Sequence, residues 1–436
     1  MILNNKQIVK NFLSIDCNKA KMSLSEISKF FTEKSLDEII IKAGGTKHTS
    51  FKFGKGFKKG DSYLSKVFRL CVYGEHETLK TKQEINLIIK SMPDNLARRK
   101  LFRSADFFRN EIYYYTKVIP ALEEFQKSKN PLNPFTEYPK CYLCHCDGEN
   151  DFIALEDVSF LGYGSPNRQD YISIDECRIT MRTMGRLHGI GLTFADQEPK
   201  AFSETMGKLE ETYYGERIRS WYMGFLRLAI TVAKDAVSKT YPGTKYETIV
   251  NKYLQEGLYS DQIKIVGTRG KFSSVCHGDC WTPNFLTKYR EDGSPEAVKV
   301  IDYQLTRCAS IALDISFFIY SCTSQELREK HYLSLLKDYH DSACALIKDL
   351  GSNPDKVLTF EELLAELKAF GRFGCGMGIE SLPMSLIEDD EVADLDAIQE
   401  NAILTDVWNI TPFKEEAKRK RIADIFKHAI DQEYIQ

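Results

Sequence analysis

Hydrophobic and polar residues alternate along the first third of the chain in the way that β-strands require. Residues 62–74 (SYLSKVFRLCVYG) alternate and are rich in aromatic and β-branched side chains, and residues 85–93 (INLIIKSMP) form a short apolar run closed by proline. Residues 141–146 (CYLCHC) and 152–158 (FIALEDV) flank the turn-forming sequence DGEN, which predicts a β-hairpin. One helix is predicted between these strands, over residues 105–125, where apolar residues follow helical spacing.

After residue 158 the strand signal weakens and helical spacing dominates. Helices are predicted over residues 174–192, 204–238, 325–350, 360–373 and 413–430. A sheet with one helix, followed by a mostly helical part, predicts an α+β protein of two lobes. A crevice between two such lobes is the natural place for a ligand.

Composition limits the classes of protein that fit this pattern. The 436 residues include 59 Lys and Arg against 62 Asp and Glu, so the net charge is −3, which argues against a nucleic-acid-coating protein. The 12 cysteines are spread from Cys17 to Cys375, which favours reduced thiols in a cytoplasmic protein over a disulfide framework. The N-terminus shows no signal-peptide core, and the most apolar stretch, Ile311 to Cys322, is too short to span a bilayer. No membrane or nucleic-acid partner is therefore expected.

The strongest chemical signal is residues 277–284 (HGDCWTPN), followed by the strand-like run that ends in Asp302. Asp279 and Asn284 have the spacing of the D-x-x-x-x-N catalytic loop of protein kinases, and Asp302 stands where a metal-binding Asp follows. Phosphoryl transfer needs a carboxylate to orient the attacking hydroxyl, and carboxylate and amide oxygens to hold Mg²⁺. Any one of the three could simply cap a turn. Their shared order and spacing favour the catalytic interpretation.

Earlier residues supply what an ATP site needs. Lys90 ends an apolar strand and Glu111 lies on the predicted helix, the order in which kinases pair a lysine with a glutamate beside the α- and β-phosphates. The segment Lys42 to Gly60 contains six lysines, no acid and a G-x-G-x-x-x-G run, which suits phosphates. Taken alone, that segment reads as a flexible basic loop.

Three cysteines near residue 145 invite a different interpretation. Cys141, Cys144 and His145 match the C-x-x-C-H pattern of covalent haem attachment, and with Cys146 they could form half of a zinc site. Covalent haem attachment requires an exported protein, and no export signal is present. A zinc site requires a second pair of ligands at suitable spacing. Strand cysteines that pack as small apolar residues are the favoured reading.

Seven segments together resemble the ecdysteroid kinase-like family, also called CHK-kinase-like, which is related to choline kinases and aminoglycoside phosphotransferases. The segments are GDSYLS (60–65), LIIKSMP (87–93), FRNEIYYY (108–115), LEDV (155–158), MGRLHG (184–189), HGDCWTPN (277–284) and IDYQLTRCASIALDISFFIYSCTS (301–324). The resemblance implies a protein-kinase-like fold with an N-terminal lobe over residues 1–157 and a C-terminal lobe over residues 158–436. It also implies transfer of the γ-phosphate of ATP to a small-molecule hydroxyl, with ATP and Mg²⁺ as cofactors.

The resemblance further implies a role for each matching residue. Asp279 would be the catalytic base, and His277 would orient its loop. Asn284 and Asp302 would bind Mg²⁺. The nucleotide would be held by the phosphate loop, the lysine–glutamate pair and the hinge, which are Gly60, Asp61, Ser62, Lys90, Glu111, Glu156, Asp157 and Val158. Asp314 would anchor the catalytic loop from below, and His188 would pack behind it, neither of them touching substrate.

The acceptor is restricted by what the chain lacks. Only 11 residues separate Asp302 from Asp314, so there is no activation segment on which a protein substrate could lie. Six acids between Glu388 and Asp396 would suit a cationic acceptor, as in a choline or aminoglycoside kinase, unless they are merely solvated.

Aromatic residues in the second half of the chain offer the other choice of acceptor. Trp221, Tyr222, Phe225, Phe370 and Phe373 could line an apolar pocket, unless they are core. The resemblance favours an ecdysteroid or a hydroxylated xenobiotic, and hence detoxification. A non-catalytic sterol-binding protein on the same fold is the remaining alternative.

Overall fold

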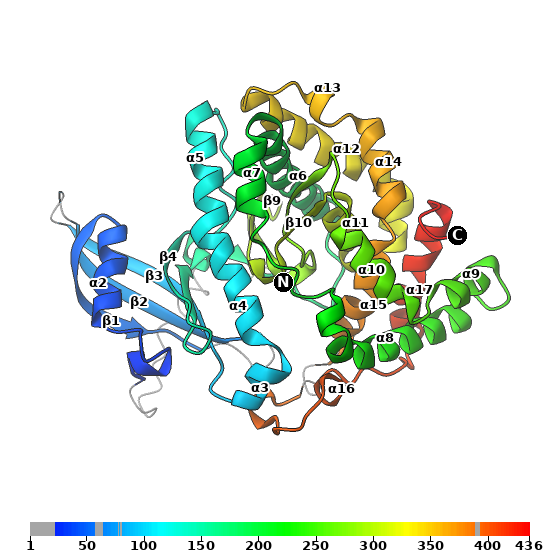
Figure 1. Cartoon of the computed structure of the whole chain (residues 1–436), viewed down its shortest axis with the longest axis horizontal. Coiled ribbons are helices and arrows are strands. Elements are labelled where there is room, and N and C mark those ends of the chain that lie inside the picture. Colours follow the sequence, from blue (N-terminus) through cyan, green and yellow to red (C-terminus); the bar gives the residue numbers. More distant parts are fainter. Residues whose placement is uncertain (1–21, 57–63, 77, 79–80, 389–392) are drawn as a thin grey trace. The chain divides into compact units, whose positions relative to one another are not determined.

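The computed structural model describes residues 22–56, 64–76, 78, 81–388 and 393–436 (Figure 1). Two compact units are present. The first comprises residues 1–94 and 140–157, and the second comprises residues 95–139 and 158–436. Residues 95–139, which carry the predicted helix with Glu111, therefore group with the helical unit. No helix in the described ranges is long and apolar enough to cross a membrane.

The first unit is built on one antiparallel sheet of five strands in the order β1-β2-β3-β5-β4. The strands are β1 (Gly45–Phe53), β2 (Lys66–His76), β3 (Lys82–Ser91), β4 (Cys141–His145) and β5 (Phe152–Glu156). Alternate residues of β2 face the core, where Phe68, Leu70 and Val72 are buried. Helix α2 (Glu33–Lys42) covers this face with its own apolar side chains. The alternation read from the sequence thus corresponds to a sheet with one helix-covered face.

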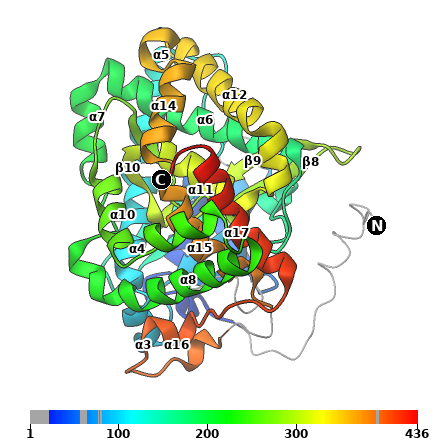
Figure 2. The same cartoon turned by 90° about the vertical axis from the view of Figure 1, so that its right-hand side faces the viewer.

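The second unit is mostly helical. Its main helices are α3 (Leu96–Leu101), α4 (Ser104–Tyr113), α5 (Ile119–Lys129), α6 (Ile174–Gln197), α8 (Arg219–Thr240), α11 (Ala312–Cys322), α12 (Gln325–Asp349), α15 (Phe373–Leu386) and α17 (Glu416–Asp431). The unit also contains α7 (Pro199–Met206), α9 (Lys245–Tyr253), α10 (Gly257–Gly267), α13 (Pro354–Val357), α14 (Phe360–Phe370) and α16 (Leu404–Val407). Figure 2 shows α8, α15 and α17 side by side.

Short strands and turns complete the second unit. A two-stranded sheet pairs β10 (Arg307–Ser310) with β7 (Ser273–Cys276), and a three-stranded sheet has the order β6-β8-β9. Its strands are β6 (Tyr163–Gly164), β8 (Phe285–Tyr289) and β9 (Pro295–Val300). Within the described residues, 3-10 turns are found at Leu24–Glu26 in the first unit and, in the second, at Val158–Leu161, Glu216–Ile218, Thr282–Asn284, Tyr303–Leu305 and Leu395–Ala397.

Helix α6 packs closely along α12, and small residues make this possible. A Cβ atom added at Gly185 would lie 2.4 Å from the carbonyl oxygen of Tyr339, which is too close for any real side chain. Gly189 faces the backbone of Ala343 one turn further along. The glycines cost helix propensity, and the close packing of the two helices offsets that cost.

The predicted α+β class is confirmed, but the structure differs from three of the predicted segments. Residues 204–238 are not one helix, because α7 ends at Met206 and the chain runs irregularly, through Gly207 and Gly215, before α8. Within the basic segment that was predicted to be a loop, residues 45–53 form strand β1. The predicted helix 105–125 is two helices joined by a π-helical segment, Tyr114–Val118, next to Pro120, which has no N–H for a regular helix.

Candidate functional site

Two short β-ladders bring the residues of the predicted catalytic loop and metal site together. Strand β7 leads into residue 277 and pairs with β10, so that Cys276 lies opposite Arg307. Strand β8 leaves the loop at residue 285 and pairs with β9. The ladder continues one step further, since the amide N–H of Ile301 donates to the carbonyl oxygen of Asn284 at 3.0 Å. Asn284 and Asp302 are therefore neighbours, although 17 positions separate them in the sequence.

The carboxylate of Asp279 is held on one side by two amide groups. Its Oδ2 accepts hydrogen bonds from Nδ2 of Asn284 at 3.0 Å and from Nε2 of Gln304 at 3.5 Å. Within the described part of the chain, Oδ1 accepts no hydrogen bond, so one carboxylate oxygen is available to an incoming hydroxyl. Burial, together with the negative charge of Asp302, raises the pKa of Asp279 to about 7.

Asn284 and Asp302 suit a magnesium ion. The amide nitrogen of Asn284 is used by Asp279, to whose carbonyl oxygen it also donates at 2.9 Å, which leaves its Oδ1 as an acceptor. Asp302 has a left-handed backbone, with φ 68° and ψ 59°, an uncommon conformation for a residue other than glycine. An amide oxygen and a carboxylate are hard oxygen ligands of the kind that Mg²⁺ prefers.

His277 holds the loop in shape rather than facing solvent. Its Nε2 lies 2.8 Å from the carbonyl oxygen of Ile301, and its Nδ1 lies 3.2 Å from the amide nitrogen of Asp279. These partners assign the proton to Nε2, since a carbonyl accepts and an amide N–H donates. Burial lowers the pKa of His277, in keeping with a neutral ring. His277 therefore links the loop to the strand end that carries Asp302.

Asp314 anchors the same loop from beneath. Its carboxylate accepts the amide N–H groups of His277 at 2.6 Å and Gly278 at 2.9 Å, and it lies 3.1 Å from Nε2 of His188. Burial alone would raise the pKa of Asp314, but the hydrogen bond and charge of His188 bring it below its usual value. Gly278 has φ +85°, and an added Cβ would lie 2.1 Å from the carbonyl oxygen of Leu305. Only glycine fits there.

Helix α4 is fastened to the segment that follows Asp302. Nδ2 of Asn110 donates to the carbonyl oxygens of Gln304 at 3.0 Å and Thr306 at 2.8 Å. The ring of Tyr114 stacks on that of Tyr303, with centroids 3.9 Å apart. Gln304 is thus held by its backbone while its side chain reaches Asp279. Gln304 and Asn110 were not among the residues predicted from the sequence to act at the site, although both lie in the segments that carry the family resemblance.

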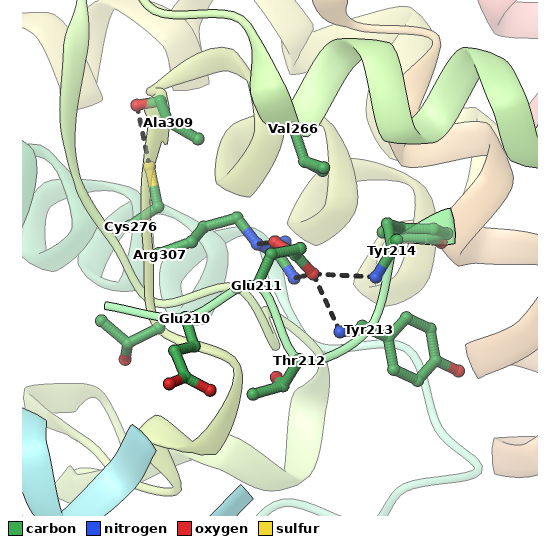
Figure 3. A network of polar contacts seen from close by, with 12 residues as sticks. Glu210, Glu211, Thr212, Tyr213, Tyr214, Val266, Cys276, Arg307 and Ala309 are labelled. Atoms are coloured by element: carbon green, nitrogen blue, oxygen red, sulfur yellow. Dashed lines mark hydrogen bonds and ion pairs between the residues drawn. The ribbon is translucent and has the colours of Figure 1, made fainter. Parts of the chain in front are cut away.

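An ion pair between the buried Arg307 and the half-buried Glu211 holds another segment against β10 (Figure 3). Glu211 accepts from Nε of Arg307 at 2.8 Å, and its Oε1 accepts the amide N–H groups of Tyr213 and Tyr214, both at 2.9 Å. Thr212 next to it donates to the carbonyl oxygen of Gln304 at 3.5 Å. These contacts explain why residues 207–215 leave the helical path that their spacing predicts.

The comparison with protein families settles the assignment of the chain. A model of the ecdysteroid kinase-like family matches residues 59–352, more than half of the 436 residues. This chain belongs to the ecdysteroid kinase-like family. The matched residues include the loop 277–284, Asp302 and Asp314.

Solved structures with a similarity to this ecdysteroid kinase-like protein were also found. Plasmodium vivax ethanolamine kinase is 12% identical, with a TM-score of 0.36 and 78% of each chain covered. The complex of APH(2")-IIia with GDP and kanamycin is 11% identical, with a TM-score of 0.34, covering 79% of this chain and 90% of the other. A search of curated proteins found no match.

The other residues predicted for the nucleotide lie in different parts of the ecdysteroid kinase-like chain. Gly60, Asp61 and Ser62 lie outside the described residues. In the first unit, Lys90 is half-buried on β3, opposite Val67 on β2 and Ile153 on β5. Glu111 is buried on α4 in the second unit.

The predicted hinge begins where β5 ends. Glu156 is the last residue of β5, and the buried carboxylate of Asp157 lies 3.1 Å from Nε of Arg69. Val158 is buried at the start of a 3-10 turn. The run 156–158 therefore passes from the first unit into the second.

The structure shows the surroundings of several residues from two further sequence features. Tyr222, Phe225 and Phe373 are each at most 1% exposed and pack on other aromatic rings, so they belong to the core. In the acidic segment, Glu388 pairs with Lys418 at 2.8 Å and Asp396 with Arg98 at 2.9 Å, while residues 389–392 lie outside the described residues.

Proposed function

We propose that this protein is a kinase that transfers the γ-phosphate of ATP, with Mg²⁺, to a hydroxyl group of a small molecule. The observation that carries the proposal is the arrangement around Asp279. One carboxylate oxygen is held by Asn284 and Gln304, and the other is open to an acceptor. The β8–β9 ladder, extended by the hydrogen bond from Ile301 to Asn284, brings Asn284 near the strand end that carries Asp302, which supports a metal bound by these two residues.

In this proposal each residue of the loop has one task. Asp279 orients the acceptor hydroxyl through Oδ1 and receives its proton as the oxygen attacks. Asn284 and Asp302 would hold Mg²⁺, which would supply positive charge to the phosphates. His277 and Asp314 keep the loop rigid, so that the carboxylate does not have to be ordered in each turnover. Family membership supports the same reading.

Most residues that we propose to bind ATP lie in the first unit or on α4. We assign the α- and β-phosphates to Lys90, oriented by Glu111, and the remaining phosphate contacts to Gly60, Asp61 and Ser62. Glu156, Asp157 and Val158 would meet adenine through their backbone groups. The boundary between the two lobes is proposed at residue 157.

The acceptor is proposed to be small and uncharged, such as an ecdysteroid or a hydroxylated xenobiotic. Residues 303–310 form a tight 3-10 turn and strand β10, whose residues are all buried, so this stretch offers no platform for a peptide. Glu388 and Asp396 are each matched by a cation, which weakens the case for a cationic acceptor.

A screen of acceptors tests the proposal. Purified protein is incubated with ATP and Mg²⁺ and with one acceptor at a time: an ecdysteroid, a phenolic glycoside, choline, ethanolamine or kanamycin. The expected result is a mass gain of one phosphate on a neutral hydroxylated acceptor, abolished by a chelator. A gain on choline, ethanolamine or kanamycin alone would establish the cationic alternative. Sterol binding without any phosphate gain would establish a non-catalytic carrier.

A matched pair of variants isolates the role of Asp279. Asp279→Asn removes the base and is expected to lower turnover by at least about a hundredfold. Asp292→Asn makes the same chemical change at an exposed turn between β8 and β9, where the carboxylate only accepts from Ser294. It should leave turnover unchanged. Equal activity of both variants would remove Asp279 from the proposed role.

A further inference from the structure

Strand β4 contains a pair of cysteines whose sulfur atoms touch. Sγ of Cys141 and Sγ of Cys144 lie 3.3 Å apart, and both side chains are half-buried. The two residues are three positions apart, and residues three apart in a regular strand point to opposite faces of the sheet. A regular strand would therefore keep these two thiols apart.

A β-bulge explains the contact. Cys141 pairs with Leu155 and Cys144 with Ile153, while the register shifts between Cys141 and Leu143. The bulge inserts one extra residue, Tyr142, into β4. Because Ile153 and Leu155 are two apart on β5, they point to the same face, and the cysteines opposite them do so too. The irregularity of β4 is thus what brings the two thiols together.

His145, the neighbouring residue that could bind a metal, points away from the two cysteines, which argues against a metal site. His145 lies opposite Phe152, and its ring packs on Phe152 and Phe30, on the face covered by α2. Its Nε2 lies 3.2 Å from the carboxylate of Asp147. Within the described residues, the chain's one cluster with three metal-ligand atoms close together is His188, Cys276 and Asp314, in the other unit. The geometry at β4 is that of a dithiol.

We propose that Cys141 and Cys144 are a redox modification site that a small-molecule disulfide of the glutathione type oxidises to an intramolecular disulfide. The thiolate of one cysteine attacks the small disulfide, whose S–S bond breaks and releases one small thiol. The second cysteine, as its thiolate, attacks the mixed disulfide and releases the other small thiol. The two cysteines lose two protons and two electrons, and the small disulfide gains them. The proposal is independent of the kinase activity.

The position of the pair favours reaction. β4 is an edge strand of the sheet, with β5 on one side only. Other thiols of the same unit provide contrast: Cys146 is exposed but lies beyond the end of β4, and burial raises the pKa of Cys71 on β2 to about 11. Cys71 is therefore almost entirely in the unreactive thiol form at neutral pH.

The test uses the folded full-length chain and oxidised glutathione. After incubation, remaining thiols are alkylated in acid-quenched protein and the chain is digested with trypsin. Cleavage after Lys140 and Arg168 places Cys141, Cys144 and Cys146 on one peptide. The expected peptide has lost two hydrogen atoms and carries one alkyl group, on Cys146. Alkylation of all three cysteines, or a glutathione adduct on Cys146 alone, would overturn the proposal.

Variants and an unfolded control complete the test. Cys146→Ser should retain the loss of two hydrogens, whereas Cys141→Ser and Cys144→Ser should each abolish it. Because the bulge preorganises the pair, the ratio of disulfide to dithiol should be at least about tenfold higher in folded protein than in urea at the same glutathione ratio. Equal ratios would show that the folded geometry contributes nothing, and the proposal would be wrong.

Discussion

Glu380 is a carboxyl group buried in the helical unit, and its replacement by glutamine tests whether burial keeps it protonated. It lies on α15 and accepts hydrogen bonds from the hydroxyl groups of Tyr213 at 2.7 Å and Tyr214 at 3.3 Å. Burial raises the pKa of Glu380 to about 8 from the usual 4.5, although the two tyrosine hydrogen bonds lower it. The folded protein should therefore hold a proton there at neutral pH.

The sign and size of the effect follow from this pKa. The unfolded chain releases the proton of Glu380 near pH 4.5, whereas the folded chain keeps it until about pH 8. The stability that the protonated group provides is therefore complete below pH 4.5 and is lost as the pH rises to 8. At about 1.4 kcal/mol for each pKa unit, the loss is about 5 kcal/mol over the whole range and roughly 3 kcal/mol between pH 5 and pH 7.

Urea unfolding at several pH values measures this loss. All three tryptophans lie in the second unit, and Trp221 packs on Tyr213, so tryptophan fluorescence reports on the unit that contains Glu380. The Glu380→Gln variant stays neutral at every pH, and its stability should fall less between pH 5 and pH 8 than that of the unchanged protein. Glu400→Gln, at an exposed position, should behave like the unchanged protein. Parallel curves for Glu380→Gln and the unchanged protein would refute the reasoning.

Three further predictions concern the loop, one of its supports and a buried histidine on α17. Gly278→Ala places a Cβ against the carbonyl oxygen of Leu305, so turnover should fall at least about tenfold and the melting temperature should drop, as thermal unfolding and an activity assay would show. Asn110→Ala removes the hydrogen-bond donor to the carbonyl oxygen of Gln304. The free energy of unfolding in urea should fall by about 1–3 kcal/mol, and kcat should fall by a larger factor than KM rises. Burial lowers the pKa of His428 to about 3. The free energy of unfolding should therefore fall by about 5 kcal/mol in all as the pH falls from 6.5 towards 3, because the unfolded chain takes up the proton first. In urea unfolding at several pH values, His428→Gln should reduce this dependence on pH.

The sequence predicted those strands and helices in which apolar residues recur at regular short intervals. The alternation in β2 and the helical spacing of residues 174–192 correspond to real elements, because each buries one continuous apolar face. Residues 207–215 left the predicted helix because Glu211 is bound by Arg307, a partner almost a hundred positions away. No window of local sequence contains that information.

In the candidate site, too, some residues could be predicted from local spacing and others act through distant contacts. Asp279, Asn284 and Asp302 could be selected from their spacing, because a short loop followed by a hairpin constrains where they lie. Gln304 and Asn110 could not, since their importance comes from hydrogen bonds between a turn and a distant helix. Three-dimensional contacts assign these two residues to the support of the loop.

The same limit applies to the aromatic residues. Their helical spacing was compatible with both a pocket and a core, and periodicity alone could not distinguish the two. The structure shows that Tyr222 and Phe225 are core residues.

A single-turnover experiment with ATP labelled in its γ-phosphate tests the central claim most directly. The protein, Mg²⁺ and an acceptor that gains phosphate in the screen are mixed, and the label is followed into the acceptor and into inorganic phosphate. The account predicts label in the acceptor as a phosphate ester, at a rate at least about a hundredfold lower in Asp279→Asn than in Asp292→Asn. Label that appears only in inorganic phosphate, or a transfer rate that Asp279→Asn leaves unchanged, would contradict it.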